Sequence, residues 1–208
     1  LAIAATLLAS AAVCGAANAQ GQAPFAPVPA NDTAPAGALD NLPSRTIANG
    51  LVSAKVYLPD PFGFYRSTRF DHAGVITSLT AGGTEFYGPW FERTAPEVLD
   101  YTYVGDDVVG GPDSAISGPV EEFAPLGFQQ KPGLFVKIGV GVLRQPDDKA
   151  YDHYRHYQIV DAGKRQTLSS GHSVTFIHTL SGAGYAYEYG KALTVVPGTS
   201  QMQIGHVL

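Results

Sequence analysis

The 208-residue sequence is poor in cysteine and in charge: Cys14 is its only cysteine, and 15% of its residues are Asp, Glu, Lys or Arg. Cys14 lies in an N-terminal segment that we expect to be removed, so the mature chain would have no disulfide, thiolate metal site or cysteine nucleophile. The net charge is -5 and Lys and Arg are scattered, which excludes a nucleic-acid surface because phosphate binding requires clustered cations. Phosphate-loop, zinc-helix and nucleophile-elbow motifs are absent, and we expect neither a metal nor a cofactor.

Residues 1–13 form an uncharged apolar run that is shorter than the roughly 20 residues a membrane-spanning helix needs. The tripeptide Ala17-Asn18-Ala19 follows, with the small-x-small pattern of a signal-peptide cleavage site. We therefore predict a signal peptide at residues 1–19, no membrane span, and an exported protein of bacterial type, either periplasmic or extracellular.

Two alternatives for this segment remain open. One is a buried N-terminal helix, which the lack of a polar face disfavours. The other is a lipid-modified Cys14, which is disfavoured by Val13 because a lipoprotein signal normally has a small residue there. The sequence opens with Leu1 rather than Met, and we expect that a few leader residues precede it.

Residues 20–48 contain five prolines among alanines and small polar residues, with no apolar period. Proline removes backbone donors, and such a composition is typical of a flexible, solvated tether. We predict that the folded domain comprises residues 49–208. At this length, one domain can bury most of its apolar surface.

Apolar and polar residues alternate along 52–58 and 136–142, which predicts half-buried strands of period two. Similar patterns predict further strands at residues 75–80, 85–87, 154–160, 173–180, 185–195 and 201–208. Short Gly-rich clusters separate these segments and favour antiparallel hairpins, while no stretch has a helical period. The expected fold class is all-β, an antiparallel β-sandwich or open barrel.

Two segments depart from this regular pattern. Residues 92–133 are irregular and rich in Gly, Pro and acidic residues, and loops of that length tend to carry function. Residues 201–208 alternate like a strand and then stop without a polar tail. We therefore expect a sandwich that is incomplete at the C-terminus of this sequence, with an unpaired edge.

Several short motifs resemble the galactose-mutarotase-like (aldose 1-epimerase-like) superfamily. Residues 70–79 and 82–89 resemble its opening hairpin, in which a Gly-apolar-x-x-Leu strand leads to a second strand near the substrate cleft. Residues 116–128 resemble the Gly-Pro-rich loop and Gly-Phe element of sugar-phosphate epimerase relatives. The hairpin of residues 185–195 and 202–208 is similar to the strands that precede the catalytic histidine of the family.

The resemblance spans about residues 49–208 and implies a supersandwich of the galactose-mutarotase type. It also implies that the catalytic histidine and glutamate of the family lie beyond residue 208. In epimerase relatives this loop carries a substrate-binding arginine, but residues 117–122 contain none. The resemblance therefore leaves open a different sugar, or no sugar at all.

Glu121 and Glu122 stand in the middle of the irregular segment. Adjacent side chains of an extended chain point to opposite faces, so we expect at most one carboxylate to face a cleft. A carboxylate in a sugar site accepts hydroxyl hydrogen bonds, or acts as a general base where burial raises its pKa. The alternative is a solvated turn or an ion pair.

Three further residues are candidates for binding a substrate. Arg69 has a planar guanidinium that suits bidentate contacts with a carboxylate or with vicinal hydroxyls, the alternative being a structural ion pair. Trp90 is the only tryptophan and is a candidate for stacking on a sugar ring, against plain core burial. His178 follows an apolar strand and is the histidine that we place in a cleft, with a structural histidine as the alternative.

Together these observations predict an exported carbohydrate-active or carbohydrate-binding protein with a carbohydrate ligand. As an enzyme it would be an isomerase, an aldose 1-epimerase that opens the sugar ring by acid-base catalysis. The alternatives are a non-catalytic carbohydrate-binding protein and an accessory domain of a polysaccharide-degrading enzyme.

Overall fold

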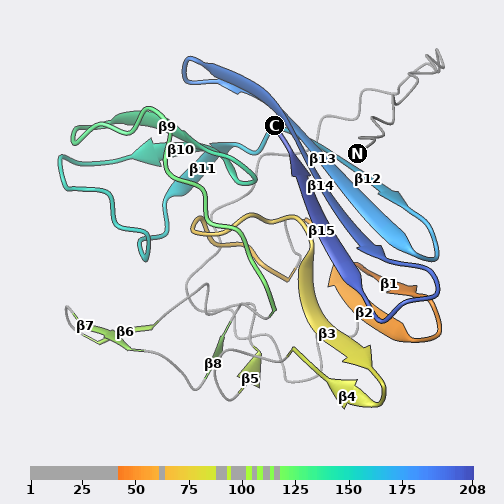
Figure 1. The fold of residues 1–208 in the computed structure, drawn as a ribbon. Helices are drawn as coiled ribbons and strands as arrows, with labels where there is room; N and C mark the ends of the chain where they lie inside the picture. Colours follow the sequence, from red (N-terminus) through yellow and green to blue (C-terminus); the bar gives the residue numbers. More distant parts are fainter. Residues whose placement is uncertain are drawn as a thin grey trace, which may run out of the picture.

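The computed structural model describes residues 42–60, 64–87, 93–94, 102–104, 107–109, 113–114 and 118–208. The predicted signal peptide, most of the predicted tether and Trp90 lie outside the described residues. All regular elements in the described part are strands, and helices are absent from it. The described part of the chain is therefore all-β, as predicted (Figure 1).

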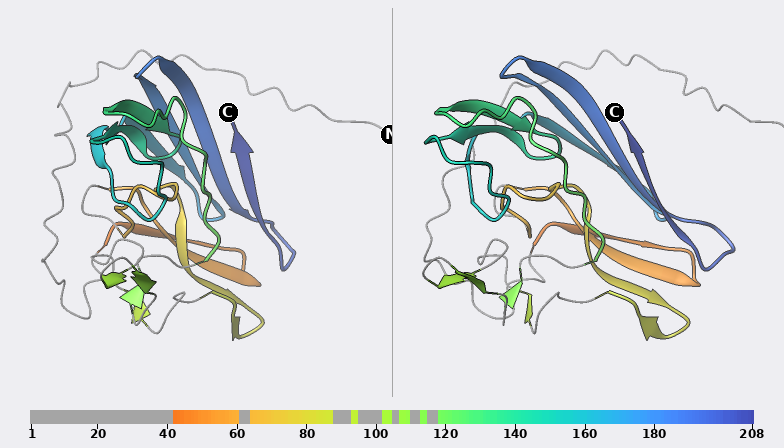
Figure 2. Two further views of the ribbon diagram at one scale, coloured as in Figure 1. Left: turned by 90° about the vertical axis from the view of Figure 1, so that its left-hand side faces the viewer. Right: turned by 60° about the vertical axis from the view of Figure 1, so that its left-hand side comes forward.

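Two four-stranded antiparallel sheets form the main sandwich. The first has the order β1-β2-β3-β4, and its strands are Ser44–Ala48, Val52–Tyr57, Val75–Ala81 and Thr84–Glu85. The second has the order β12-β13-β14-β15, and its strands are Lys164–Ser169, Ser173–Gly182, Tyr185–Val195 and Met202–Val207. Figure 2 shows the two sheets as stacked layers that diverge toward the β13–β14 hairpin.

A continuous apolar core joins these two sheets. Ile47 and Val56 from the first sheet pack with Phe176 and Leu193 from the second, and none of the four is more than 4% exposed. Each of these residues belongs to the apolar half of an alternating strand, and burial of that half is the main stabilising contribution.

A third antiparallel sheet, of order β11-β10-β9, packs on the inner face of the second sheet, the face that the first sheet also covers. Its strands are β9 (Gly133–Lys137), β10 (Gly141–Gln145) and β11 (Gln158–Asp161). Val136 and Val142 pack against Leu180 of β13, which fixes this sheet to the sandwich. Two small strand pairs complete the described strands. β5 (Arg93–Thr94) and β8 (Asp113–Ser114) form a parallel pair, and β6 (Thr102–Val104) and β7 (Asp107–Val109) form an antiparallel pair.

The prediction of one continuous strand over 136–142 was wrong. β9 ends at Lys137 and β10 begins at Gly141, so the apolar alternation runs through a hairpin turn. Gly139 and Gly141 adopt φ angles of 77° and 146°, a region that favours glycine, and they allow the chain to reverse there. Ile138 and Val140 are nevertheless buried, which explains why the pattern looked like a strand.

The predicted boundary at residue 49 was also too late. β1 lies inside the predicted tether, where Ile47 is fully buried and Leu42 packs against the apolar cluster around Tyr57. Pro43 comes just before β1 and accepts a hydrogen bond from the Leu58 amide at 2.8 Å. The last proline of the Pro-rich segment thus belongs to the sandwich rather than to a solvated linker.

The long strands at the C-terminal end agree with the prediction. β14 has the predicted bounds, and β13 and β15 differ from them by one or two residues. β12 was not predicted, because its burial is slight and its sequence is polar. The described residues contain no helix that is long and apolar enough to cross a membrane.

Candidate functional site

Two segments without regular structure, one around Asp71 and one around Glu121, cover the inner face of β14. They meet where these two residues lie. The Asp71 amide donates a hydrogen bond to the Glu121 carbonyl oxygen at 2.9 Å. Beneath them, the Lys191 ammonium donates to the Ala73 carbonyl oxygen at 2.8 Å. Lys191 lies two residues after Tyr189 on β14, so the two side chains share the inner face. The sheet thereby holds both segments in place.

Glu121 bridges two strands of the sheet. One carboxylate oxygen forms an ion pair with the buried Lys191 ammonium, and the other is 3.1 Å from Nε2 of His206 on β15. The Glu121 side chain is 20% exposed and the His206 side chain is 37% exposed, so solvent reaches this pair. The His206 ring is also parallel to the Tyr189 ring, with a centroid distance of 6.1 Å.

Asp71 lies below this pair and is fully buried. Its carboxylate accepts hydrogen bonds from the Tyr189 hydroxyl at 3.0 Å and from the Ala73 amide at 2.9 Å. Burial raises the pKa of Asp71 to about 6, although the Lys191 ammonium at 3.9 Å opposes the shift. Asp71 has no solvent-exposed side-chain surface, so it supports the inner face of the site instead of contacting a ligand.

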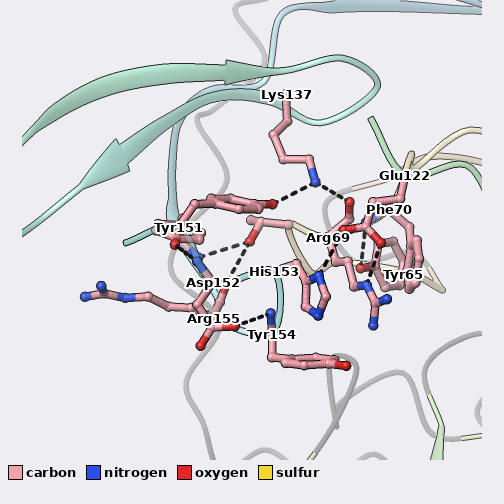
Figure 3. Close-up of polar contacts among 12 residues, drawn as sticks. Tyr65, Arg69, Phe70, Glu122, Lys137, Tyr151, Asp152, His153, Tyr154 and Arg155 are labelled. Atoms are coloured by element: carbon pink, nitrogen blue, oxygen red, sulfur yellow. Dashed lines mark hydrogen bonds and ion pairs between the residues drawn. The ribbon is translucent and has the colours of Figure 1, made fainter. Parts of the chain in front are cut away.

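Glu122 points away from Glu121 and forms a second pair with a histidine. Its carboxylate accepts a hydrogen bond from Arg69 Nε at 2.9 Å and lies 3.6 Å from Nδ1 of His153 (Figure 3). The Arg69 guanidinium also lies over the Tyr154 ring, 5.0 Å from its centroid. The Glu122 and His153 side chains are 30% and 39% exposed, so this pair also reaches solvent.

A buried lysine fixes the backbone at Arg69. The Lys137 ammonium donates to the Arg69 carbonyl oxygen at 2.7 Å and to the Tyr151 hydroxyl at 2.9 Å (Figure 3). Tyr151 stacks on Tyr157 with an interplanar angle of 6°, and burial raises its pKa. Lys137 of β9 therefore fixes the backbone at Arg69 in the same way that Lys191 of β14 fixes the backbone at Ala73. In both cases a buried ammonium group donates to a carbonyl oxygen.

His178 has a structural environment. Its Nε2 donates to the Ala162 carbonyl oxygen at 2.9 Å, and its Nδ1 accepts from the Tyr187 hydroxyl at 3.2 Å. Burial and the nearby Arg165 guanidinium lower the pKa of His178 to about 3, so the ring is neutral. The residue is 2% exposed and both ring nitrogens have protein partners. This burial does not fit the predicted position in a cleft, and it results from the inward alternation of β13.

The structure brings together three of the predicted site residues, namely Glu121, Glu122 and Arg69. The two carboxylates point in opposite directions, as expected for adjacent residues of an extended segment. His206, His153 and Lys191 were not predicted to join them, because they come from elements that are distant in the sequence. The only signal for Lys191 was its place on one face with Tyr187 and Tyr189.

The chemistry of this site comes from carboxylates, imidazoles and aromatic rings. No group of three or more metal-ligating side chains lies together in the part of the chain that the structure describes. The chain matches no protein-family model, and comparison with curated proteins and with solved structures gives no significant match.

Proposed function

We propose that this chain is an exported carbohydrate-binding or carbohydrate-active protein that binds its ligand on the two sides of this segment, at Glu121 on one side and at Glu122 with Arg69 on the other. The supporting observation is the pair of carboxylate–imidazole contacts, Glu121 with His206 and Glu122 with His153, on adjacent residues. Both pairs are partly exposed, so their oxygen and nitrogen atoms are within reach of a ligand. Sugar hydroxyl groups both donate and accept, and such pairs offer both functions.

The aromatic surroundings also favour a sugar ligand. The Tyr154 ring lies beside Arg69, and the Tyr189 ring lies beside His206. A binding site for a small polar ligand typically combines such apolar surfaces with a few fixed polar groups. Here buried lysines and backbone hydrogen bonds fix the polar groups before any ligand arrives, which reduces the entropy lost on binding.

The enzymatic form of the proposal is an aldose 1-epimerase. Ring opening requires a base that removes the proton from the anomeric hydroxyl and an acid that protonates the ring oxygen. Glu121 with His206 has groups of both kinds. The non-catalytic form is favoured by one specific observation, the ion pair of Glu121 with Lys191, because the ammonium occupies one of the two carboxylate oxygens.

The proposal is tested by titrating the purified chain with D-galactose and D-glucose and following binding by isothermal titration calorimetry. Glu122→Gln and Arg69→Lys should each weaken binding by about tenfold, because a charge-assisted hydrogen bond is worth roughly 1.5 kcal/mol or more. Glu188→Gln is the matched control, since Glu188 is exposed on β14 and lies on the opposite face from Tyr189. Equal affinity of all four proteins would contradict this site.

Polarimetry then separates the two forms of the proposal. If the protein is an epimerase, it accelerates the decay of optical rotation of freshly dissolved α-D-galactose or α-D-glucose, and Glu121→Gln slows this decay. If it only binds sugar, the decay matches the rate in buffer while the calorimetric signal remains. Absence of both signals for both sugars would overturn the proposal for these aldoses.

A further inference from the structure

A pocket of about 530 Å³ lies away from the site described above. It lies between the tip of the β13–β14 hairpin and the β9–β10 hairpin, which Figure 2 shows next to each other. Tyr185 contributes to the pocket from the start of β14, whereas Lys191 is six residues further along the same strand. At a rise of about 3.3 Å per residue, the two positions are about 20 Å apart. The pocket is therefore separate from Glu121.

Gln145 is a buried polar residue of this pocket, and one of its polar atoms has no partner. The side chain is 2% exposed, and its Nε2 donates to Asp147 Oδ1 at 3.1 Å and to the Lys149 carbonyl oxygen at 2.8 Å. These two acceptors fix the orientation of the amide, because a flipped amide would place oxygen against oxygen. Oε1 is then left without a hydrogen bond to any described residue. The Oε1 atom has less than 1 Å² of exposed surface, so Gln145 forms part of the fixed wall of the pocket.

Tyr185 supplies an aromatic surface to the same pocket. Its side chain is 39% exposed, and its ring lies against Gly127, where an added Cβ would be 2.7 Å from Tyr185 Cε2. The glycine therefore allows the ring to lie directly on the backbone. Ala183, at the hairpin tip, has a φ of 50°, an uncommon conformation for a residue other than glycine. Such strained residues are enriched in ligand-binding regions.

The pocket also contains one basic side chain. Lys131 lines it and is exposed, and the described residues give it no ion pair. Leu134 lines the pocket too and is 45% exposed, which adds apolar surface. A cation and an aromatic ring in one pocket suit a ligand that combines an anionic group and an apolar face.

We propose that this pocket is a second saccharide site, which binds an acidic sugar of the uronic acid class. A C–H face of the sugar lies on Tyr185, and the sugar carboxylate pairs with Lys131. The ligand class rests on the proposed function, whereas the position of the site does not. Binding here involves no bond making or breaking.

The test is a titration of the ¹⁵N-labelled chain with D-glucuronate and, as the neutral counterpart, D-glucose, followed by amide NMR shifts. D-glucuronate should shift the amides of Gly127, Gly133 and Gly184. Tyr185→Ala should weaken this binding by about tenfold, as expected for loss of a stacking aromatic. Phe86→Ala is the matched control and should leave it unchanged, because Phe86 is an aromatic residue that is 60% exposed outside the pocket.

The preference for the acidic sugar is tested separately. Lys131→Met should remove the preference for D-glucuronate over D-glucose, which we expect to be a few-fold because exposed ion pairs are weak. Lys164→Met, at an exposed position of β12, should preserve it. An equal response to the two sugars in the unmodified chain would overturn the acidic-sugar assignment.

The positions of the shifted amides distinguish this inference from the proposed function. Shifts at the pocket glycines that Tyr185→Ala weakens support the second site, whether or not Glu121 and His206 also respond. Shifts confined to Glu121 and His206 overturn the second site and leave the proposed function standing. Shifts at neither place, for both sugars, contradict both.

Discussion

Lys191 on the inner face of β14 and Glu121 in the segment that covers it form an ion pair across 70 residues of sequence. The Lys191 side chain is 1% exposed, whereas the Glu121 side chain is 20% exposed. The same ammonium donates a hydrogen bond to the Ala73 carbonyl oxygen. One lysine therefore fixes both covering segments, and the position of the candidate site depends on it.

Lys191→Met should destabilise the fold. The substitution leaves the Ala73 carbonyl oxygen and the Glu121 carboxylate without their buried donor. We expect the free energy of unfolding to fall by about 3 kcal/mol, the lower end for breaking a buried pair, because solvent can rehydrate Glu121. Urea unfolding measures this change, and Lys164→Met, which alters an exposed lysine of β12, should change it by less than about 0.5 kcal/mol.

A double variant separates the ion pair from the packing of the lysine stem. The loss of stability in the double variant Lys191→Met, Glu121→Gln should be smaller than the sum of the losses in the two single variants. The reason is that a neutral amide at position 121 does not need the Lys191 cation. Strict additivity of the two losses would contradict an energetic coupling between Lys191 and Glu121.

The strand that carries this lysine was predictable from local patterns. Along β14 the side chains of Tyr187, Tyr189 and Lys191 alternate with exposed or half-buried residues, and Gly-rich turns bound the strand on both sides. The same rule failed at 136–142, because burial on two sides of a hairpin turn mimics a continuous strand. Local alternation identified Ile138 and Val140 as buried, but it missed the burial of Lys137 and the change of chain direction at Gly139.

The candidate site was predictable only in part. Opposite directions for Glu121 and Glu122 follow from the geometry of an extended chain, and the structure confirms them. Their partners could not be derived, because Lys191 and His206 reach Glu121 through the register of two strands far along the chain. That register depends on the packing of the whole sandwich rather than on any short motif.

Gly139→Ala should be more destabilising than an ordinary glycine substitution. Gly139 has a φ of 77°, and a Cβ there would overlap Oδ1 of the buried Asp71. Gly50→Ala is the matched control, since Gly50 has a φ of 85° and open space around it. We expect a loss of about 1 kcal/mol at Gly50 from backbone strain and at least about 2 kcal/mol more at Gly139. Equal urea midpoints would contradict a close contact between Gly139 and Asp71.

The buried titratable groups predict a stability that decreases in acid. Burial lowers the pKa of His72 and His178 to about 3, below the usual value near 6.5, so they take up protons only on unfolding. Burial raises the pKa of Asp71 to about 6, so its proton is released on unfolding. Near about pH 5 the net uptake by these three groups is about one proton, and the lowered pKa of His156 acts in the same direction. The free energy of unfolding should therefore fall by at least about 1.4 kcal/mol per unit decrease in pH.

Asp71→Asn tests the sign of the aspartate contribution. With the Asp71 proton removed from the balance, unfolding near about pH 5 takes up about one proton more than in the unmodified chain. The slope of the free energy of unfolding against pH should therefore increase by about 1.4 kcal/mol per pH unit. Urea unfolding at about pH 5, 6 and 7 measures both slopes, and circular dichroism at about pH 7 verifies that the variant is folded. An unchanged slope would show that Asp71 is ionised throughout this range, which would make the Lys191 ammonium a stronger influence on its pKa than burial.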